Sequence, residues 1–149
     1  MEIDFKVEGL DEIEKKLIAL GAETGFKTLR NAARKSMQPV LDDAKANAWE
    51  DSGDMKASLS IRTRKGKGKS NAVTAEVGSF KRTLTEKQSD GSKTKRKINR
   101  QDAKVAAQEY GVRGRAPEPF LRPALNDNAE TVLGIFKKAL VKAIEKATK

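Results

Sequence analysis

Two stretches in the first third of the chain have apolar residues at every third or fourth position, the spacing that predicts amphipathic helices. The first covers residues 10–20 and stops at Gly21, with acidic residues in its first turn that suit the helix dipole. The second covers residues 25–48 and contains Pro39. Because proline has no backbone N–H and its ring crowds the preceding turn, we expect a kink there.

The last third predicts two further helices. One covers residues 102–110 and ends at Gly111, and its apolar positions Val105, Ala106 and Tyr110 are expected to face inward. The other runs from about residue 121 to the C-terminus, with an apolar side of its own. Trp49 ends the apolar stripe of the 25–48 helix, which favours a place in the core over a role as a binding aromatic.

Short strands are expected between these helices. Apolar and polar residues alternate at 3–7 and 71–80, and a strand-like stretch at 60–64 follows a polar turn and a short helical turn that Ser52 or Asp54 could cap. Strands this short among longer helices predict an α+β fold, with a small antiparallel sheet packed against long amphipathic helices that include a C-terminal one. A length of 149 residues favours a single domain over residues 1–149.

Residues 81–100 resemble an insertion into that domain. They are nearly devoid of large apolar side chains, with only Leu84 and Ile98. Such a segment is either a disordered loop or an extended hairpin arm.

Composition excludes most catalytic mechanisms. The chain has neither cysteine nor histidine, so it lacks thiolate nucleophiles, the usual general base and the commonest zinc ligands. The candidate acidic pair, Asp42 and Asp43, is adjacent, and neighbouring side chains on a helix point about 100° apart. We therefore expect a protein that is not an enzyme and holds no cofactor or metal.

The chain shows no sign of export or membrane insertion. No apolar run approaches the length of a membrane span, and the N-terminus lacks the basic start and apolar centre of a signal peptide. We expect a protein that stays in the cytoplasm where it is made.

Positive charge is concentrated in the middle of the chain. The formal net charge is +10, and residues 62–100 hold 13 Lys and Arg against three acids, while the remaining 18 bases and 18 acids cancel. Two clusters flank the strand at 71–80 and are expected in loops at the ends of a sheet. Their members are Arg62, Arg64, Lys65, Lys67 and Lys69 in the first, and Lys93, Lys95, Arg96, Lys97 and Arg100 in the second.

Three interpretations of this charge stay open. The clusters are solvated loops that add solubility, or they contact a polyanion such as DNA through phosphate, or they meet an acidic surface of a partner protein. No aromatic residue lies among residues 81–100 to stack on exposed bases, which disfavours specific recognition of single strands.

Residues 109–125, "EYGVRGRAPEPFLRPAL", form a stiff segment ahead of the last predicted helix. Prolines 117, 119 and 123 fix φ, so the segment loses little conformational entropy on docking. It therefore suits a permanent contact better than a hinge.

Three segments in order resemble the tail-component family of tailed bacteriophages. They are "VEGLDEIEKKLIAL" near the start, "DSGDMKASL" in the middle and "AAQEYG…PEPFLRPAL" before the last helix. The third is the most specific, a Glu-aromatic-Gly followed by Pro-Phe-Leu-Arg-Pro-Ala. The resemblance covers nearly the whole chain except residues 81–100, and it departs from the family at Val112, where threonine is common.

The resemblance implies a structural virion protein of the head-tail joining region in phages with long, non-contractile tails. Such subunits form a ring, sixfold or twelvefold, around the DNA channel, between the head connector and the tail tube or tail terminator proteins. The protein would be made in the host cytoplasm, end in the tail or neck, touch packaged DNA only non-specifically and contact no membrane. The alternative is a sequence-independent nucleic-acid-binding protein acting through basic loops at 62–69 and 81–100.

The resemblance also gives the stiff segment a role as a subunit or partner interface. Phe120 would fill either an intersubunit pocket or its own core, and the arginines nearby would reach carboxylates. The candidate interface residues are Tyr110, Gly111, Arg113, Arg115, Pro117, Pro119, Phe120, Arg122 and Pro123.

Overall fold

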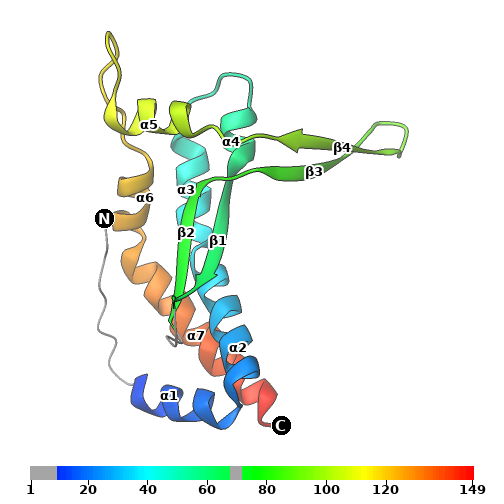
Figure 1. Ribbon diagram of the computed structural model, residues 1–149, viewed down its shortest axis with the longest axis vertical. Coiled ribbons are helices and arrows are strands. Elements are labelled where there is room, and N and C mark those ends of the chain that lie inside the picture. The colour runs from blue at the N-terminus through cyan, green and yellow to red at the C-terminus, as the bar shows by residue number, and fades with distance from the viewer. Residues whose placement is uncertain (1–9, 68–71) are drawn as a thin grey trace. The chain divides into compact units, whose positions relative to one another are not determined.

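The computed structural model describes residues 10–67 and 72–149, so the strand expected at 3–7 and the side chain of Lys69 lie outside the described residues. Helices and strands alternate in groups along the chain (Figure 1). In order they are α1 Leu10–Ala19, α2 Ala22–Ser36, α3 Gln38–Asn47, α4 Asp54–Ser58, β1 Leu59–Lys65, β2 Val73–Ser79, β3 Arg82–Lys87, β4 Lys93–Ile98, α5 Asp102–Tyr110, α6 Leu121–Asp127 and α7 Ala129–Ala147. The α+β prediction is confirmed.

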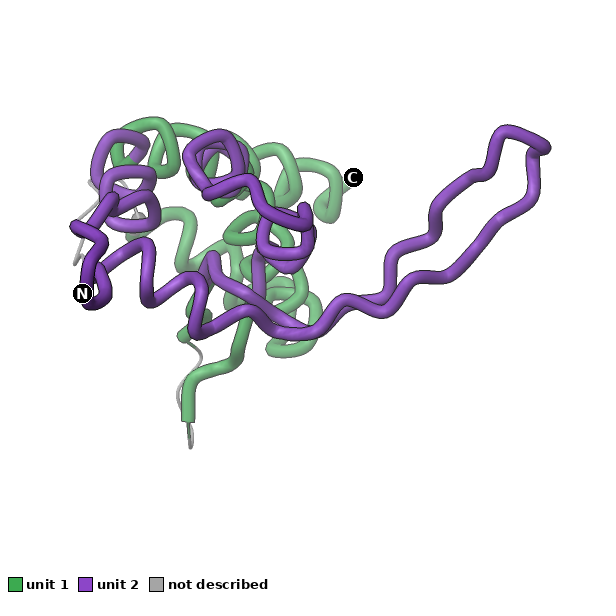
Figure 2. The backbone as a smooth tube through the Cα atoms, turned by 90° about the horizontal axis from the view of Figure 1, so that it is seen from above, with its two compact units in different colours: residues 1–38, 63–75, 129–149 green, residues 39–62, 76–128 purple. Residues whose placement is uncertain are grey.

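The chain divides into two compact units, each built from separate stretches of sequence (Figure 2). Unit 1 comprises residues 1–38, 63–75 and 129–149, and unit 2 comprises residues 39–62 and 76–128. Strands β1 and β2 pair with each other, as do β3 and β4.

Unit 1 is a helical unit in which α1 and α2 pack with α7. Its buried core consists of Ile13, Ala32, Leu140 and Ile144, and Leu17, Leu20, Leu29, Phe136 and Ala139 pack around it. These residues lie at helical spacing on one side of each helix, as the apolar pattern predicts.

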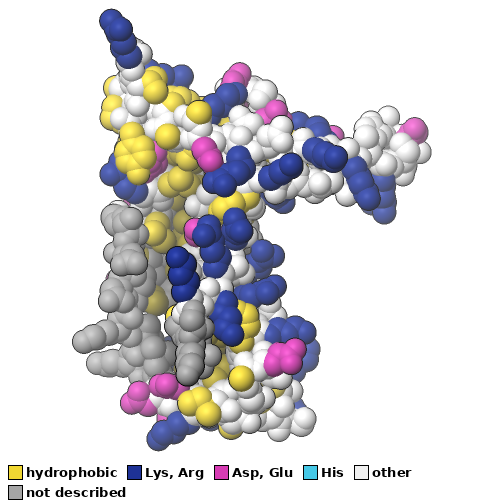
Figure 3. All heavy atoms as spheres, viewed as in Figure 1, with side chains coloured by type: hydrophobic (Ala, Val, Ile, Leu, Met, Phe, Trp, Pro, Cys, Tyr) yellow, Lys and Arg dark blue, Asp and Glu magenta, His cyan; other side chains and the backbone are white. Residues whose placement is uncertain are grey.

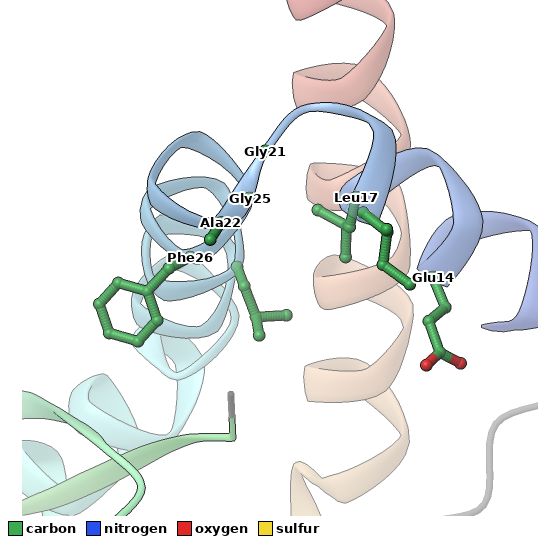
Figure 4. A pocket seen from close by; sticks show the side chains of 8 residues that line it. Glu14, Leu17, Gly21, Ala22, Gly25 and Phe26 are labelled. Atoms are coloured by element: carbon green, nitrogen blue, oxygen red, sulfur yellow. The ribbon is translucent and has the colours of Figure 1, made fainter. Parts of the chain in front are cut away.

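A glycine allows α1 and α2 to approach closely. A Cβ added at Gly25 would lie 2.8 Å from the backbone oxygen of Leu17, too close for any side chain. Beside this contact is a mainly apolar pocket of about 390 Å³, lined by residues of both helices that include Leu17, Phe26 and the carboxylate of Glu14 (Figure 4).

Both long predicted helices are interrupted. The helix expected over 25–48 begins at Ala22 and ends at Ser36, and α3 starts at Gln38, so Pro39 lies in the first turn of a new helix instead of inside a kinked one. Its missing N–H has no partner to lose there. The C-terminal helix breaks at Asn128, whose Nδ2 donates to the oxygen of Ala124 at 2.8 Å.

The predicted strands at 60–64 and 71–80 correspond to β1 and β2, and residues 81–100 form a hairpin arm, the second of the two alternatives. The short helix α4 follows the polar turn as expected. Its N-cap residue is Gly53 at φ 78°, and Ser52 Oγ accepts a long hydrogen bond of 3.4 Å from the N–H of Asp54.

Unit 2 mixes apolar and polar residues in its interior. Its buried apolar side chains are Val40, Leu41, Ala44, Ala48, Met55, Leu59, Ile98, Phe120 and Ala124. Ser79 Oγ donates to Ser58 Oγ at 2.8 Å and accepts from the N–H of Gln101 at 2.7 Å. These bonds tie α4, the end of β2 and the start of α5 together.

Helix α5 has the predicted bounds, but the prediction of its inward face is wrong. Ala106 is exposed, the side chain of Tyr110 is 70% exposed, and Val105 is only half-buried. The buried residues are Gln108 and Glu109. Polar groups face inward here because each one has hydrogen-bond partners from distant parts of unit 2.

Candidate interaction surfaces

Glu109 holds the start of α6 through a fan of hydrogen bonds. Its Oε2 accepts from the N–H groups of Phe120 at 2.9 Å and Leu121 at 3.0 Å. Its Oε1 accepts from the N–H of Arg122 at 3.2 Å and from the Nε of the same residue at 2.8 Å. The carboxylate thus satisfies donors that a helix start leaves without partners, and its charge suits the helix dipole.

The charge of Glu109 is stabilised despite its burial. Burial by itself raises the pKa of a carboxyl group. The N–H of Phe120, the Arg122 side chain and the N–H groups of Leu121 and Arg122 outweigh that effect, so the pKa of Glu109 is lowered below its ordinary value. Residue 109 is therefore an ionised, buried anchor at neutral pH.

Gln108 forms a second link within unit 2. Its Oε1 accepts from the N–H of Trp49 at 2.8 Å, and its Nε2 donates to the oxygen of Asn47 at 2.7 Å. Its backbone oxygen accepts from the N–H of Glu118 at 2.8 Å. This fully buried amide joins the end of α3 to α5 and to the segment that follows α5.

The last residue of α5 and the chain that follows it form an exposed loop, residues 110–119, which we call the 110–119 loop. Val112 and Arg115 pair across a tight turn, and Gly111 at φ 80° packs against Pro117, where an added Cβ would lie 2.9 Å from the proline Cδ. Tyr110 and Val112 are 70% and 52% exposed. They are the exposed large apolar side chains in the described part of unit 2, and they lie together on this loop.

Trp49 supports the base of the 110–119 loop. The guanidinium carbon of Arg115 lies 3.4 Å from the centre of the indole ring, and Trp49 Nε1 donates to Glu118 Oε2 at 2.9 Å. The tryptophan is half-buried, so it is both part of the packing of unit 2 and a platform for the loop.

The predicted interface residues differ in their exposure and in their contacts. Phe120 is only 1% exposed, which places it in the interior of its own unit. Arg122 and Arg115 reach carboxylates, at Glu109 and Glu118 respectively, and Arg122 also lies over the ring of Tyr110 at 5.1 Å. Gly111 is half-buried, while Arg113, Pro117, Pro119 and Pro123 are exposed.

Glu109, Gln108 and Trp49 were not among the residues predicted for this site. Their partners lie 11 to 69 residues away in sequence, so the periodicity of apolar residues does not mark them. The signal that could have pointed to Glu109 is its place at the start of the Glu-aromatic-Gly motif, ahead of the Pro-Phe-Leu-Arg-Pro-Ala run.

The hairpin of β3 and β4 has two chemically different faces. The strands are antiparallel with Arg82 opposite Ile98 and Lys87 opposite Lys93, and directly opposed residues share a face. One face carries Arg82, Leu84, Glu86, Thr94, Arg96 and Ile98. The other carries Thr83, Thr85, Lys87, Lys93, Lys95 and Lys97, and we call it the lysine face.

The first of these faces holds the hairpin to the rest of unit 2. Ile98 is 2% exposed, and Arg82 Nη1 donates to the backbone oxygens of Ala57 and Leu59 at 3.3 and 3.1 Å. Arg96 binds Asp54 at 2.7 Å and Glu86 at 2.8 Å. The lysine face is exposed at every position, and none of its four lysines forms an ion pair within residues 10–67 and 72–149.

The basic clusters lie mainly on strands, so the prediction that they occupy loops at the ends of a sheet is wrong. Arg62, Arg64 and Lys65 belong to β1, and Lys93, Lys95, Arg96 and Lys97 belong to β4. Thr63 and Thr94 among them favour strands, and basic side chains are accommodated where a strand faces solvent. Arg100 follows β4, and Lys67 lies at the bend after β1. Figure 3 shows the basic side chains spread along the hairpin.

One residue from each basic cluster meets at Phe80. The guanidinium carbons of Arg62 and Arg100 lie 5.5 and 6.0 Å from the centre of the Phe80 ring. These residues and Lys81 help line a shallow pocket of about 460 Å³. In unit 1, Lys65 lies 5.3 Å from the ring centre of Phe26.

Of the two adjacent acids, Asp43 binds two asparagine side chains. Asp43 Oδ2 accepts from Asn128 Nδ2 at 3.2 Å, and its Oδ1 accepts from Asn47 Nδ2 at 3.0 Å. Within residues 10–67 and 72–149, no group of three or more acidic side chains is gathered as a metal site would require.

One family model matches the sequence. It is described as "Bacteriophage HK97-gp10, putative tail-component" and covers residues 11–85, about half of the chain. The chain belongs to this family. The match runs from α1 into β3, so the Glu109 anchor and the 110–119 loop lie beyond it. No curated protein and no solved structure matches the chain.

Membership of this family confirms the resemblance noted in the sequence and identifies a bacteriophage tail-component protein. A tail component is part of the virion, and such a structural role favours a protein without catalytic activity. None of the helices in the described ranges is both long and apolar enough to cross a membrane.

Proposed function

We propose that this protein is a structural subunit of the head-tail joining region, where it forms a ring around the DNA channel between the head connector and the tail tube or tail terminator. A ring subunit works by presenting surfaces that do not change shape. Sixfold or twelvefold symmetry would match such neighbours.

The observation that carries this proposal is the 110–119 loop in a member of a tail-component family. The loop exposes Tyr110 and Val112 while Glu109, Gln108 and Trp49 fix both of its ends. Exposed aromatic and β-branched side chains on a rigid support lose little entropy on binding and bury apolar area in a partner. The loop is therefore the subunit or partner interface in this proposal, and Phe120 is the internal anchor behind it.

The interface is tested by replacing Tyr110 and Val112 together with serine in a phage that lacks its own copy of the gene. Unit 2 should fold normally, since both side chains are exposed, so thermal unfolding should be unchanged. Electron microscopy of lysates should show separate heads and tails in place of joined particles. Ile18→Ser is the matched control, because Ile18 is 72% exposed but lies in α1.

Three results would contradict the proposal. Joined particles at the normal frequency with the Tyr110/Val112 variant would show that the loop is not the interface. Absence of the chain from purified virions, measured by mass spectrometry, would contradict a role in the joining region altogether. Equal loss of joining with Ile18→Ser would assign the effect to exposed apolar surface in general.

A further inference from the structure

The lysine face is the part of the hairpin that the described contacts leave without a structural role. Arg82, Arg96 and Ile98 on the opposite face hold the arm to unit 2. Lys87, Lys93, Lys95 and Lys97 face solvent beside Thr83 and Thr85. Figure 2 shows the hairpin extending away from the other elements of unit 2, which leaves this face open to a large ligand.

The arrangement of charge on this face opposes folding of the hairpin. Lys87 lies directly opposite Lys93, and like charges at opposed positions destabilise a strand pair. A two-stranded hairpin is only marginally stable in water without such a cost. The acids of the hairpin do not offset it, because Glu86 binds Arg96 on the other face and Asp90 accepts from the N–H of Ser92 in the turn. A ligand that supplies negative charge would remove the repulsion.

We infer that the lysine face binds the phosphate backbone of double-stranded DNA without sequence preference. Lysine is a compact charge that attracts phosphate without a fixed geometry, and threonine hydroxyls also donate to phosphate oxygens. The face has no aromatic side chain to stack on unpaired bases, so it suits duplex DNA and not single strands.

A protein partner fits this face less well. Protein interfaces are centred on aromatic, Met and Arg side chains and are depleted in lysine. The lysine face carries none of the favoured types, since both arginines of the hairpin strands point to the other face and bind groups of unit 2. The apolar side chains that a protein partner needs lie instead on the 110–119 loop.

The inference rests on the proposed function in one respect only, the place where the lysine face meets DNA, which is the channel. Contacts made by exposed lysines through counterion release are individually weak, so DNA can slide past them. The arm would thus give the passing DNA a charged track without retaining it.

The test measures binding of the purified full-length chain to a fluorescent mixed-sequence DNA duplex between about 50 and 200 mM NaCl. The lysine-face variant replaces Lys87, Lys93, Lys95 and Lys97 with glutamine. The matched control replaces Lys137, Lys138, Lys142 and Lys146, exposed residues of α7, and lowers the net charge equally. Circular dichroism checks that both variants remain folded.

The expected result is a loss specific to the lysine face. Affinity at low salt should fall by more than about tenfold, and the slope of log K against log salt should become shallower by about 3 to 4. The α7 variant should keep nearly the normal slope. Arginine at the same four hairpin positions should restore binding, because phosphate accepts either cation.

Several outcomes would overturn the inference. Equal losses in the two glutamine variants would assign binding to net charge. If the unsubstituted chain does not bind the duplex, the lysines serve only to protect the exposed strand edges from pairing with other chains. If poly-glutamate competes as effectively as DNA at equal charge, the partner of the lysine face is an acidic protein. Because this assay uses no particles, a negative result leaves the joining proposal standing, and failure of the joining assay leaves this inference standing.

Discussion

At the scale of single residues, the most informative side chain is Glu109. A carboxylate that is 3% exposed would be unfavourable without partners, yet it accepts four hydrogen bonds from Phe120, Leu121 and Arg122. These bonds explain why a glutamate in one helix and a Pro-Phe-Leu-Arg-Pro run occur together in the sequence. The glutamate supplies the hydrogen-bond acceptor that the N–H groups at the start of α6 require.

Replacing Glu109 with glutamine should destabilise the protein by about 2–4 kcal/mol at neutral pH, because an amide group would turn two donors toward backbone N–H groups. The folded-state pKa of Glu109 is lowered, so its stabilising contribution is present above the ordinary pKa of 4.5 and is lost as the pH falls through the folded value. The difference between the two proteins in urea unfolding should therefore shrink under acidic conditions.

Glu145→Gln is the control for this measurement, since Glu145 is exposed near the end of α7. It should change the free energy of unfolding by less than about 0.5 kcal/mol. A Glu109→Gln protein as stable as the original at neutral pH would contradict the role of the carboxylate as an anchor.

At the scale of elements, sequence patterns predicted what depends on neighbouring residues and missed what depends on distant ones. The bounds of α5 follow from Asp102 and Gly111, which are local signals, and they were predicted correctly. The buried side of α5 was not, because Gln108 is stabilised by Asn47 and Trp49, about 60 residues earlier. In the same way, Pro39 predicted a kink within one long helix, but it did not predict that a new helix begins there.

The same distinction applies to the candidate site. The proline segment and the charge of residues 81–100 could be recognised from composition. The two faces of the hairpin could not, because they depend on the register that sets Lys87 opposite Lys93. A shift of the pairing by one residue would have placed the lysines of β4 on the face opposite to Lys87.

Close packing of α1 on α2 is tested at Gly25. Alanine normally favours a helix over glycine by about 1 kcal/mol, but at this position its Cβ would meet the oxygen of Leu17. We expect Gly25→Ala to destabilise the protein by about 1–3 kcal/mol because the two helices must move apart. Thermal unfolding followed by circular dichroism measures the change.

Gly134→Ala provides the opposite expectation in the same unit. Nothing lies within 4 Å of a Cβ added at Gly134, inside α7, so alanine should stabilise the protein by up to about 1 kcal/mol. Stabilisation by both substitutions would mean that the contact between Gly25 and Leu17 does not limit the approach of α1 and α2.

At the scale of the whole molecule, the charge is divided between a balanced part and a strongly basic part. Residues 62–100 carry the entire net charge of +10, and the rest of the chain is neutral. The ion pairs recorded for the hairpin involve Arg96, so the lysine face retains its repulsion in the free protein. A surface of this kind is more stable beside a polyanion than alone.

This repulsion predicts that added salt stabilises the free protein. Screening weakens interactions between exposed charges as the Debye length falls from about 30 Å at 0.01 M to about 8 Å at 0.15 M. The hairpin amides of residues 83–97 should therefore exchange with deuterium more slowly at the higher salt, as hydrogen-exchange mass spectrometry would show.

The lysine-face variant should be protected already at low salt and respond little, while the α7 variant should behave like the original. Faster hairpin exchange at high salt would mean that the ion pairs of Arg96 outweigh the lysine repulsion, and that the hairpin is held together by its anchoring face without needing a partner for the other.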